Sequence, residues 1–351
     1  MKKLISLILA LGMVFTLAAC SSNETPSNGN EPASNGNSSG NETYTLQMAV
    51  MESEIPTLGD YVDKIHEATN GRVTIEYVDI SSLGTATDAL GMVRNGAVDM
   101  YYNSAAQTGA EFPLMDMFQL PFLCSNPTDN TNLINAMYYA GYLDKELADF
   151  QPMFFVSTDM QMIFTNKEIK RVDDFKGMKI RATSGTAATF IESTGATVVT
   201  MGLGDVYLAL STGVVDGAMS SPFMIHANNF NETAPYLLNA YVFGGTIMCL
   251  MNNDTWNSLP ADIQVAILEV NASHGDWMKW DKTRLMLEDQ DYLTSNGMTL
   301  VTLSDGEMAK LQQGCSHLEQ EWIDKVTALG YDGQAMIDYA KEVLTYYSLG
   351  K

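Results

Sequence analysis

Short apolar runs alternate with amphipathic stretches along the chain from residue 44 onward. The apolar runs predict strands at residues 44–50, 73–78 and 97–101. Apolar residues at helical spacing predict helices at residues 60–69 and 85–94, and each stretch is followed at once by Asn-Gly. The order strand, helix, strand, helix, strand is typical of α/β proteins, in which helices cover both faces of a parallel or mixed sheet.

The second half of the chain repeats this arrangement. Strands are predicted at residues 178–181 and 197–201, and a helix at residues 204–212. The segment Val93-Arg-Asn-Gly-Ala-Val-Asp99 recurs as Leu210-Ser-Thr-Gly-Val-Val-Asp216, with a glycine that ends a helix before a strand. Two copies at matching points predict two lobes of the same architecture. Because ligands of such folds bind at the carboxyl ends of the strands, we expect the ligand between the lobes.

The C-terminal third is predicted to be helical. One run extends from residue 258 to about residue 294, and helices follow at residues 308–329 and 333–347. A helix of up to about 35 residues is longer than most helices of globular proteins, so we expect it to brace both lobes from behind. Residues 154–163 and 242–250 are the predicted hinge strands, where the chain crosses between the lobes.

The N-terminus has the pattern of a secretory signal. Lys2-Lys3 precedes an apolar run from Leu4 to Leu17, which is too short to span a bilayer as a helix. Residues 1–19 are therefore predicted to be a signal peptide. Leu17-Ala-Ala-Cys20 resembles a bacterial lipobox, in which Cys20 would receive lipid. The alternative is an ordinary signal peptide with a chance cysteine.

Residues 20–43 are predicted to be a disordered tether behind a lipidated Cys20. The segment is rich in Ser and Asn and has no aromatic residue, so it cannot offset the entropy of folding. A lipid anchor with a flexible tether holds a folded domain near a membrane. We therefore expect the protein to be anchored on the extracytoplasmic face of the cell membrane.

The composition indicates an acidic protein with material for two apolar cores. Its 351 residues are 46% hydrophobic, and 19 Lys and Arg face 42 Asp and Glu, a net charge of −23. Because affinity for phosphates depends on Lys and Arg, this balance argues against nucleic-acid binding. The remaining cysteines, Cys124, Cys249 and Cys315, are too widely spaced to predict a metal site, and one disulfide among them is left open.

No pattern of catalytic chemistry is present in the sequence. The 4 histidines are isolated, and neither a GxSxG segment nor a phosphate-binding loop occurs. We therefore expect no enzyme activity, no metal and no cofactor. One cation is distinctive: Arg181 ends a predicted strand, and a helix is predicted to begin directly after it. An arginine beside a helix N-terminus suits an organic carboxylate, although an exposed arginine at a strand end is the simpler interpretation.

Four segments, taken in order, resemble the solute-binding subunit of TRAP (tripartite ATP-independent periplasmic) transporters, the DctP-like family. They are Asn70-Gly-Arg-Val-Thr-Ile-Glu-Tyr-Val78 with Leu120-Pro-Phe-Leu123, Asp174-Phe-Lys-Gly-Met-Lys-Ile-Arg181, Asp205-Val-Tyr-Leu-Ala-Leu-Ser-Thr-Gly-Val-Val-Asp-Gly217, and Trp256 with Leu259-Pro260 and Asp262. The resemblance implies an α/β, two-lobe, type II periplasmic-binding-protein fold with hinge strands and a long bracing C-terminal helix. It also implies capture of a small organic acid outside the cell and its delivery to membrane permease subunits. The sequence does not determine the oligomeric state, although we expect a monomer.

Arg181 matches the arginine that binds the substrate carboxylate in this family, but other positions depart from the family. Gln161 stands where some binders of acidic sugars carry a second arginine, and Ser220 or Ser221 would replace an asparagine near the ligand. Because Gln161 is neutral, we expect a monocarboxylate with an apolar or aromatic body, unless a cation elsewhere in the cleft supplies the missing charge. The identity of the ligand does not transfer.

We predict one lobe from residues 44–158 plus about 247–287. Residues 159–246 plus about 288–351 would form the second lobe and the C-terminal helices. The predicted ligand-binding residues are Arg181, Gln161, Ser220, Ser221, Tyr101, Tyr102, Asn103, Met51, Met160, Phe223 and Tyr207. Two other functions stay open at this stage, namely a binding protein for a sensor or another transporter class, and a secreted hydrolase.

Overall fold

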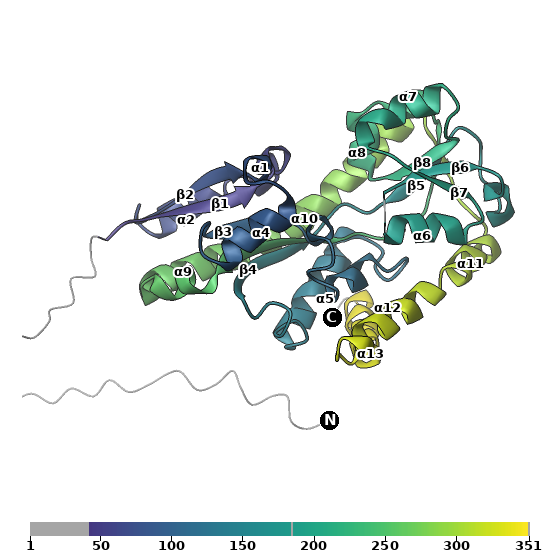
Figure 1. Ribbon diagram of the computed structural model, residues 1–351. Helices are drawn as coiled ribbons and strands as arrows, with labels where there is room; N and C mark the ends of the chain where they lie inside the picture. The colour runs from purple at the N-terminus through teal and green to yellow at the C-terminus, as the bar shows by residue number, and fades with distance from the viewer. Residues whose placement is uncertain (1–41, 184, 350–351) are drawn as a thin grey trace, which may run out of the picture. The chain divides into compact units, whose positions relative to one another are not determined.

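The computed structural model describes residues 42–183 and 185–349. The predicted signal peptide, Cys20 and all but the last two residues of the predicted tether lie outside the described residues. Two separate sheets organise the described part (Figure 1). The first has the order β2-β1-β3-β10-β4 and the second the order β11-β9-β5-β8-β6-β7.

Among the described residues, the first sheet contains five strands and the second contains six. The first sheet consists of β1 (Tyr44–Val50), β2 (Val73–Asp79), β3 (Met100–Ser104), β4 (Phe150–Ser157) and β10 (Thr246–Asn252). The second consists of β5 (Met162–Thr165), β6 (Lys179–Ala182), β7 (Thr197–Thr200), β8 (Gly217–Ser220), β9 (Tyr236–Leu238) and β11 (Thr299–Val301). In the first sheet β1 is parallel to β2 and β3, and β10 is antiparallel to β3 and β4. In the second sheet β6 is parallel to β7 and β8, and β5 is antiparallel to β8 and β9. Both sheets are therefore mixed, one of the two predicted arrangements.

The two sheets share one supersecondary unit, and it coincides with the repeated sequence segment. In the first lobe α4 (Ala86–Arg94) ends in a turn where Ala97 N and Val98 N donate to Met92 O, and Asp99 Oδ2 then accepts from Gln47 N of β1 at 2.8 Å. In the second lobe α7 (Val206–Ser211) ends the same way. Val214 N and Val215 N donate to Ala209 O, and Asp216 Oδ2 accepts from Lys179 N of β6 at 2.9 Å. The predicted two-lobe repeat is therefore confirmed.

Two short segments carry the chain between the sheets; the first lies inside the predicted hinge region 154–163, and the second overlaps the predicted region 242–250. The first links β4 to β5, and the second, residues 239–245, links β9 to β10. They hydrogen-bond to each other: Thr158 N donates to Gly245 O at 3.1 Å, and Gln161 N donates to Phe243 O at 2.8 Å. Because the crossings run side by side, they form one linkage between the two lobes.

The long helix α10 (Ala261–Ser295) is the third connection and is 35 residues long, as predicted. It packs against α2 (Tyr61–Ala68), α5 (Pro127–Tyr139) and β4 of the first lobe and against α8 (Pro222–Ala227) of the second. Its contacts with the two lobes include two hydrogen bonds, which join Tyr61 Oη to Asn271 Oδ1 and His226 Nδ1 to Asp289 Oδ1, both at 2.7 Å. The prediction of a bracing helix is confirmed.

The helix predicted at residues 308–329 is two helices, α11 (Asp305–Gly314) and α12 (His317–Ala328), with a break at Cys315 and Ser316. The break has a physical reason, because the two halves pack on different lobes. On α11, Glu307 Oε2 accepts from Val172 N of the second lobe at 2.8 Å. On α12, Trp322 Nε1 donates to Pro113 O of the first lobe at 3.0 Å.

The last helix, α13 (Gly333–Ser348), packs against α5 of the first lobe. The predicted lobe boundaries stay a prediction, but these contacts favour assigning α12 and α13 to the first lobe. Cys124, Cys249 and Cys315 are buried free thiols, so no disulfide joins them. Within residues 42–183 and 185–349, no helix is long and apolar enough to span a membrane, and no cluster of three or more His, Cys, Asp or Glu side chains could hold a metal ion.

One buried histidine links the packing of α10 to pH. His274 is fully buried between Tyr61, Phe154 and Trp277, and neither ring nitrogen has a hydrogen-bond partner among the described residues. The pKa of His274 is lowered to about 4, mainly by burial and also by nearby Lys64, while Asp60 acts in the opposite direction. Between about pH 6.5 and pH 4 the unfolded chain therefore binds a proton that the folded protein rejects, so the stability falls as the pH falls.

We predict that His274→Phe removes this part of the acid sensitivity. The wild-type protein should lose about 3 kcal/mol more of its free energy of unfolding than the variant between pH 7 and pH 4. Urea denaturation at several pH values measures this difference. The carboxylates are the same in both proteins, so their contribution to the pH dependence of stability cancels. His317 is exposed, so His317→Phe serves as the control and should keep the wild-type slope. Equal slopes for His274→Phe and the wild-type protein would contradict the prediction.

Candidate functional site

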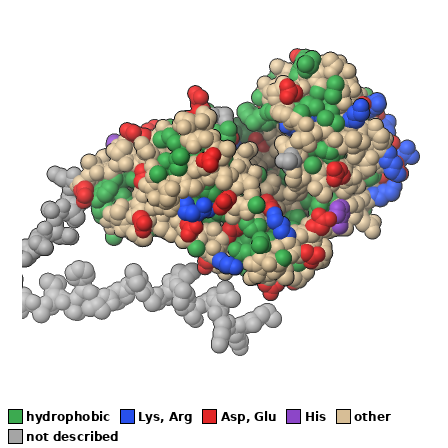
Figure 2. Space-filling model, in the orientation of Figure 1, with side chains coloured by type: hydrophobic (Ala, Val, Ile, Leu, Met, Phe, Trp, Pro, Cys, Tyr) green, Lys and Arg blue, Asp and Glu red, His purple; other side chains and the backbone are tan. Residues whose placement is uncertain are grey.

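A cavity of about 380 Å³ lies where strands of both sheets end. From the first lobe, Ser104 at the end of β3 and Gln107 just beyond it reach the cavity; from the second, Thr183 follows β6 and Ser221 follows β8. The crossing segments contribute Thr158, Asp159, Gln161 and Gly245. The surface of the molecule is hollowed between the two lobes (Figure 2). This is the place that the carboxyl ends of the strands predict for a ligand.

Arg181 is the buried cation of this cavity. It lies in β6 and is 5% exposed. Its Nε and Nη2 donate to Met201 O at 3.1 and 2.9 Å, and Nη1 donates to Met219 O at 3.4 Å. No carboxylate of the described residues forms an ion pair with it, and burial lowers the pKa of its guanidinium. The carbonyl groups fix the side chain but leave its charge uncompensated, which is costly in a buried site unless an anion arrives.

Three other predicted residues join Arg181 at the cavity wall. Gln161, Ser220 and Ser221 line it, and the two serines are almost completely buried. Ser221 also begins α8, because its Oγ accepts from Met224 N at 3.4 Å. The structure therefore brings together the four polar residues that the sequence comparison singled out, all of them close to the ends of second-lobe strands.

The predicted aromatic and methionine residues do not line the cavity. Tyr101, Tyr102 and Met160 are fully buried in the protein interior, and Asn103 is nearly so. Met51, Tyr207 and Phe223 are exposed outside the lining. Strand β3 begins at Met100 and not at residue 97, because the turn after α4 extends through Val98. The residues expected beyond the strand end thus lie within the strand, and their ligand-binding role stays a prediction.

The sequence analysis missed three charged residues of the cavity, namely Glu54, Asp159 and Lys282. Glu54 follows β1 closely, and Asp159 lies inside the predicted hinge region. Both positions could have indicated from the sequence that these residues lie near the ligand. No sequence pattern distinguishes Lys282 as a cavity residue, because it is one of many charged residues on α10. Burial raises the pKa of Asp159, while nearby Lys282 lowers it and Asp289 raises it.

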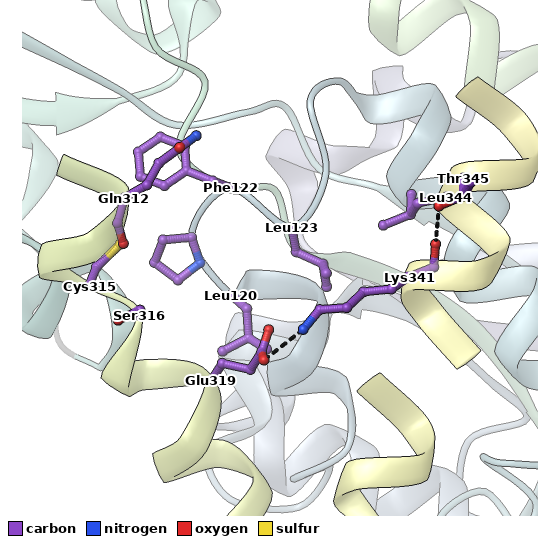
Figure 3. Close-up of a pocket in the computed structure, with 11 residues that line it drawn as sticks. Leu120, Phe122, Leu123, Gln312, Cys315, Ser316, Glu319, Lys341, Leu344 and Thr345 are labelled. Carbon is purple, nitrogen blue, oxygen red and sulfur yellow. Dashed lines mark hydrogen bonds and ion pairs between the residues drawn. The ribbon is translucent and has the colours of Figure 1, made fainter. Parts of the chain in front are cut away.

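A separate cavity of about 510 Å³ lies between residues 120–123 and the C-terminal helices (Figure 3). Lys341 crosses it to reach Glu319, and their Nζ and Oε1 atoms are 2.8 Å apart. The charges in this cavity already have partners. It also lies away from the strand ends, so it is a weaker candidate for a ligand site.

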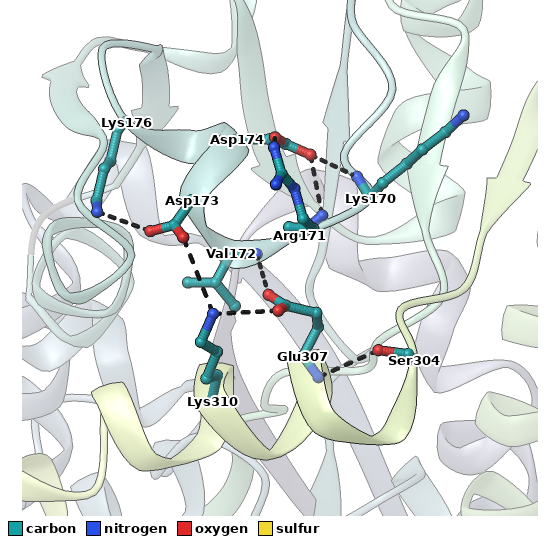
Figure 4. Close-up of polar contacts among 9 residues, drawn as sticks. All are labelled: Lys170, Arg171, Val172, Asp173, Asp174, Lys176, Ser304, Glu307 and Lys310. Carbon is teal, nitrogen blue, oxygen red and sulfur yellow. Dashed lines mark hydrogen bonds and ion pairs between the residues drawn. The ribbon is translucent and has the colours of Figure 1, made fainter.

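Basic residues gather on one edge of the second lobe (Figures 2 and 4). The basic residues drawn in Figure 4 each have an acidic partner. Lys176 and Lys310 approach Asp173, Arg171 contacts Asp174, and Lys310 also contacts Glu307. The partner of Lys170 is Glu168, which is not drawn. Most of these side chains are exposed, where ion pairs contribute little to stability. The acids neutralise this edge, so it is not a second anion site.

The family model of the bacterial extracellular solute-binding proteins, family 7 (DctP), matches residues 55–325. The chain belongs to this family. Members of the family bind solutes rather than transform them, which excludes the hydrolase alternative. Among its relatives is the ectoine-binding periplasmic protein TeaA of Halomonas elongata, 24% identical over 81% of this chain and 86% of that protein. Another is the C4-dicarboxylate-binding periplasmic protein DctP of Rhodobacter capsulatus, 27% identical over 60% of this chain and 64% of that protein.

Solved structures of solute-binding proteins have the same fold as this chain. A TRAP periplasmic solute-binding protein of Desulfovibrio salexigens is 25% identical, with a TM-score of 0.80 over 86% of this chain and 96% of that chain. An extracytoplasmic solute receptor of Bordetella pertussis, in a complex with pyroglutamic acid, is 23% identical, with a TM-score of 0.71 over 85% and 100% of the two chains. The two-lobe fold is confirmed, and the protein is a TRAP solute-binding subunit.

The close packing at the second crossing predicts a sensitive glycine. A Cβ on Gly244 would lie 2.7 Å from Ser157 Oγ and 2.9 Å from Asn130 Nδ2, which hydrogen-bond to each other at 3.0 Å. We expect Gly244→Ala to lower the free energy of unfolding by about 1–3 kcal/mol, because the crossing must shift to admit the methyl group. The space around Gly204 is open, so Gly204→Ala is the control and should be close to neutral. Urea denaturation measures both, and equal midpoints for the two variants would contradict the predicted strain.

Proposed function

We propose that the protein captures a small organic acid through a carboxylate that pairs with Arg181, and that it delivers this acid to a TRAP permease. The single observation that carries the proposal is the buried guanidinium at the cavity, which is held by carbonyl oxygens and lacks a carboxylate partner among the described residues. A carboxylate can accept two parallel hydrogen bonds from such a group. A relative that binds C4-dicarboxylates and a structural neighbour with pyroglutamic acid support an acidic ligand.

We further propose that the ligand is a monocarboxylate. Gln161 lines the cavity and is neutral, whereas the second cation there, Lys282, has a carboxylate, Asp159, beside it. A structural neighbour from Rhodoferax ferrireducens with benzoate is consistent with one carboxylate on an aromatic body. Apolar and polar side chains both line this cavity, so the body of the ligand meets both kinds of group. The apolar ones include Leu203, Met219, Met224, Phe243 and Ile247, and the polar ones include Gln107, Gln119 and Thr183.

Arg181→Ala should weaken binding of the acid by about 2–5 kcal/mol, since it removes the partner of a desolvated charge. Arg181→Lys should recover only part of the loss, because an ammonium group lacks the planar fork of the guanidinium. The ligand is first identified by a thermal-shift screen of organic acids, and its affinity is then measured by calorimetry.

Arg171 is exposed on the same lobe, so Arg171→Ala is the matched control and should bind as the wild-type protein does. Circular dichroism checks that each variant is folded. Near-normal affinity in a folded Arg181→Ala protein would refute the proposed role of Arg181.

We also propose that Cys20 is lipidated and holds the protein on the extracytoplasmic face of the cell membrane. The support is the sequence Leu17-Ala-Ala-Cys20, followed by a polar segment up to residue 43, directly before β1. Dual acylation gives stable anchoring where one chain is marginal. Cys20→Ser should move the protein from the membrane fraction to the soluble fraction, and mass spectrometry should show the lipid on the wild-type N-terminus. An unmodified Cys20, or a Cys20→Ser protein that stays membrane-bound, would exclude the anchor.

A further inference from the structure

Two opposite charges of the cavity have no partner in the described part of the chain. Asp159 and Lys282 both line the cavity, and Lys282 is close enough to lower the pKa of Asp159. The two side chains form no ion pair with each other, and neither has a side-chain hydrogen bond among the described residues. The remaining carboxylate of the cavity, Glu54, accepts a hydrogen bond from Thr57 Oγ1 at 3.3 Å. Asp289 is also engaged, with His226.

The backbone fixes both unpartnered residues. Asp159 lies between the two hydrogen bonds that join the crossings, from Thr158 N to Gly245 O and from Gln161 N to Phe243 O. Lys282 lies one helical turn from Met278 and from Met286, which are both buried, so it lies on the inner face of α10. The pair therefore belongs to the elements that join the lobes, whereas Arg181 belongs to the second lobe.

Arg181 is also separate from this pair. It forms no ion pair with Asp159 or with any other carboxylate of the described residues, and its nitrogens donate to Met201 O and Met219 O. The cavity is therefore lined by an uncompensated guanidinium on β6 and by a positive and a negative side chain on the elements that join the lobes. A ligand that fills the cavity must satisfy all three charged groups.

The opposite charges of Asp159 and Lys282 determine which ligand group can bind beside them. A second carboxylate would attract Lys282 but face Asp159, and an ammonium group would attract Asp159 but face Lys282. A methyl group would leave both desolvated without a partner. A hydroxyl or amide group donates to the carboxylate and accepts from the ammonium group at no cost in charge.

We infer that Asp159 and Lys282 form a second ligand subsite that binds an uncharged hydroxyl or amide group, while the carboxylate of the same molecule binds Arg181. This inference rests on the proposed function and narrows the substrate class to monocarboxylates with a hydroxyl or amide group away from the carboxylate.

The test is calorimetry of the full chain with straight-chain monocarboxylates of about four to eight carbons, whose far end is a methyl, hydroxyl, ammonium or carboxylate group. At the best chain length, the hydroxyl-ended acid should bind at least about tenfold more tightly than the other three. Lys282→Gln should shift the preference toward the ammonium-ended acid, and Asp159→Asn toward the dicarboxylate. Lys279→Gln, on the same helix but outside the cavity, and Asp173→Asn, on the surface, are the matched controls and should keep the wild-type order.

The outcomes separate this subsite from the proposed function. Equal affinity for methyl-ended and hydroxyl-ended acids, an unchanged order in both variants, or no binding of any member of the series would overturn the subsite. The proposed function is tested apart from it, by the loss of binding in Arg181→Ala with the acid found in the thermal-shift screen. If that variant binds as the wild-type protein does, the proposed function fails whatever the order of the series.

Discussion

The cavity depends on a guanidinium group that is buried at the end of a strand with carbonyl oxygens as its only protein partners in the described residues. Carbonyl dipoles offset part of the cost of removing Arg181 from water, but they cannot cancel a full charge. The side chain is also fixed, because two of its nitrogens share Met201 O. Folding has therefore already covered the free-energy cost of removing Arg181 from water and of fixing its side chain. A carboxylate ligand binds to a preorganised cation, and this preorganisation favours binding.

The position of Arg181 follows from the unit that both lobes share. In each lobe a glycine ends a helix, and the aspartate three residues later accepts a hydrogen bond from the backbone of a neighbouring strand. For Asp216 that neighbouring strand is β6, which carries Arg181, and Asp216 binds its first residue, Lys179. The repeat thus fixes the start of β6, two residues before Arg181. This part of the fold could be predicted from the sequence, because local backbone chemistry at a glycine and an aspartate determines it.

The rest of the cavity could not be predicted in this way, for reasons that differ from residue to residue. Residues 97 and 98 are apolar and suit a strand, yet their amide groups complete the turn after α4, so β3 begins later and buries Tyr101 and Tyr102. Lys282 reaches the cavity only because α10 packs against both lobes, which depends on tertiary packing and not on local sequence. The break at Cys315 reflects the separate docking of α11 and α12 on two lobes. Gly314 directly precedes the break, but one glycine inside a helical pattern is tolerated and does not by itself predict two helices.

The crossings line the cavity themselves, and this has a consequence for how a ligand acts on the lobes. A ligand can shift the arrangement of the lobes only through contacts that differ between the arrangements. A group bound to Arg181 alone would move with the second lobe and make no such difference. Contacts with Asp159 on the first crossing, or with Ser104 and Gln107 of the first lobe, would make one, because these residues do not belong to the lobe that carries Arg181. On the proposed function, the carboxylate therefore supplies affinity, and the far end of the ligand couples binding to the position of the lobes.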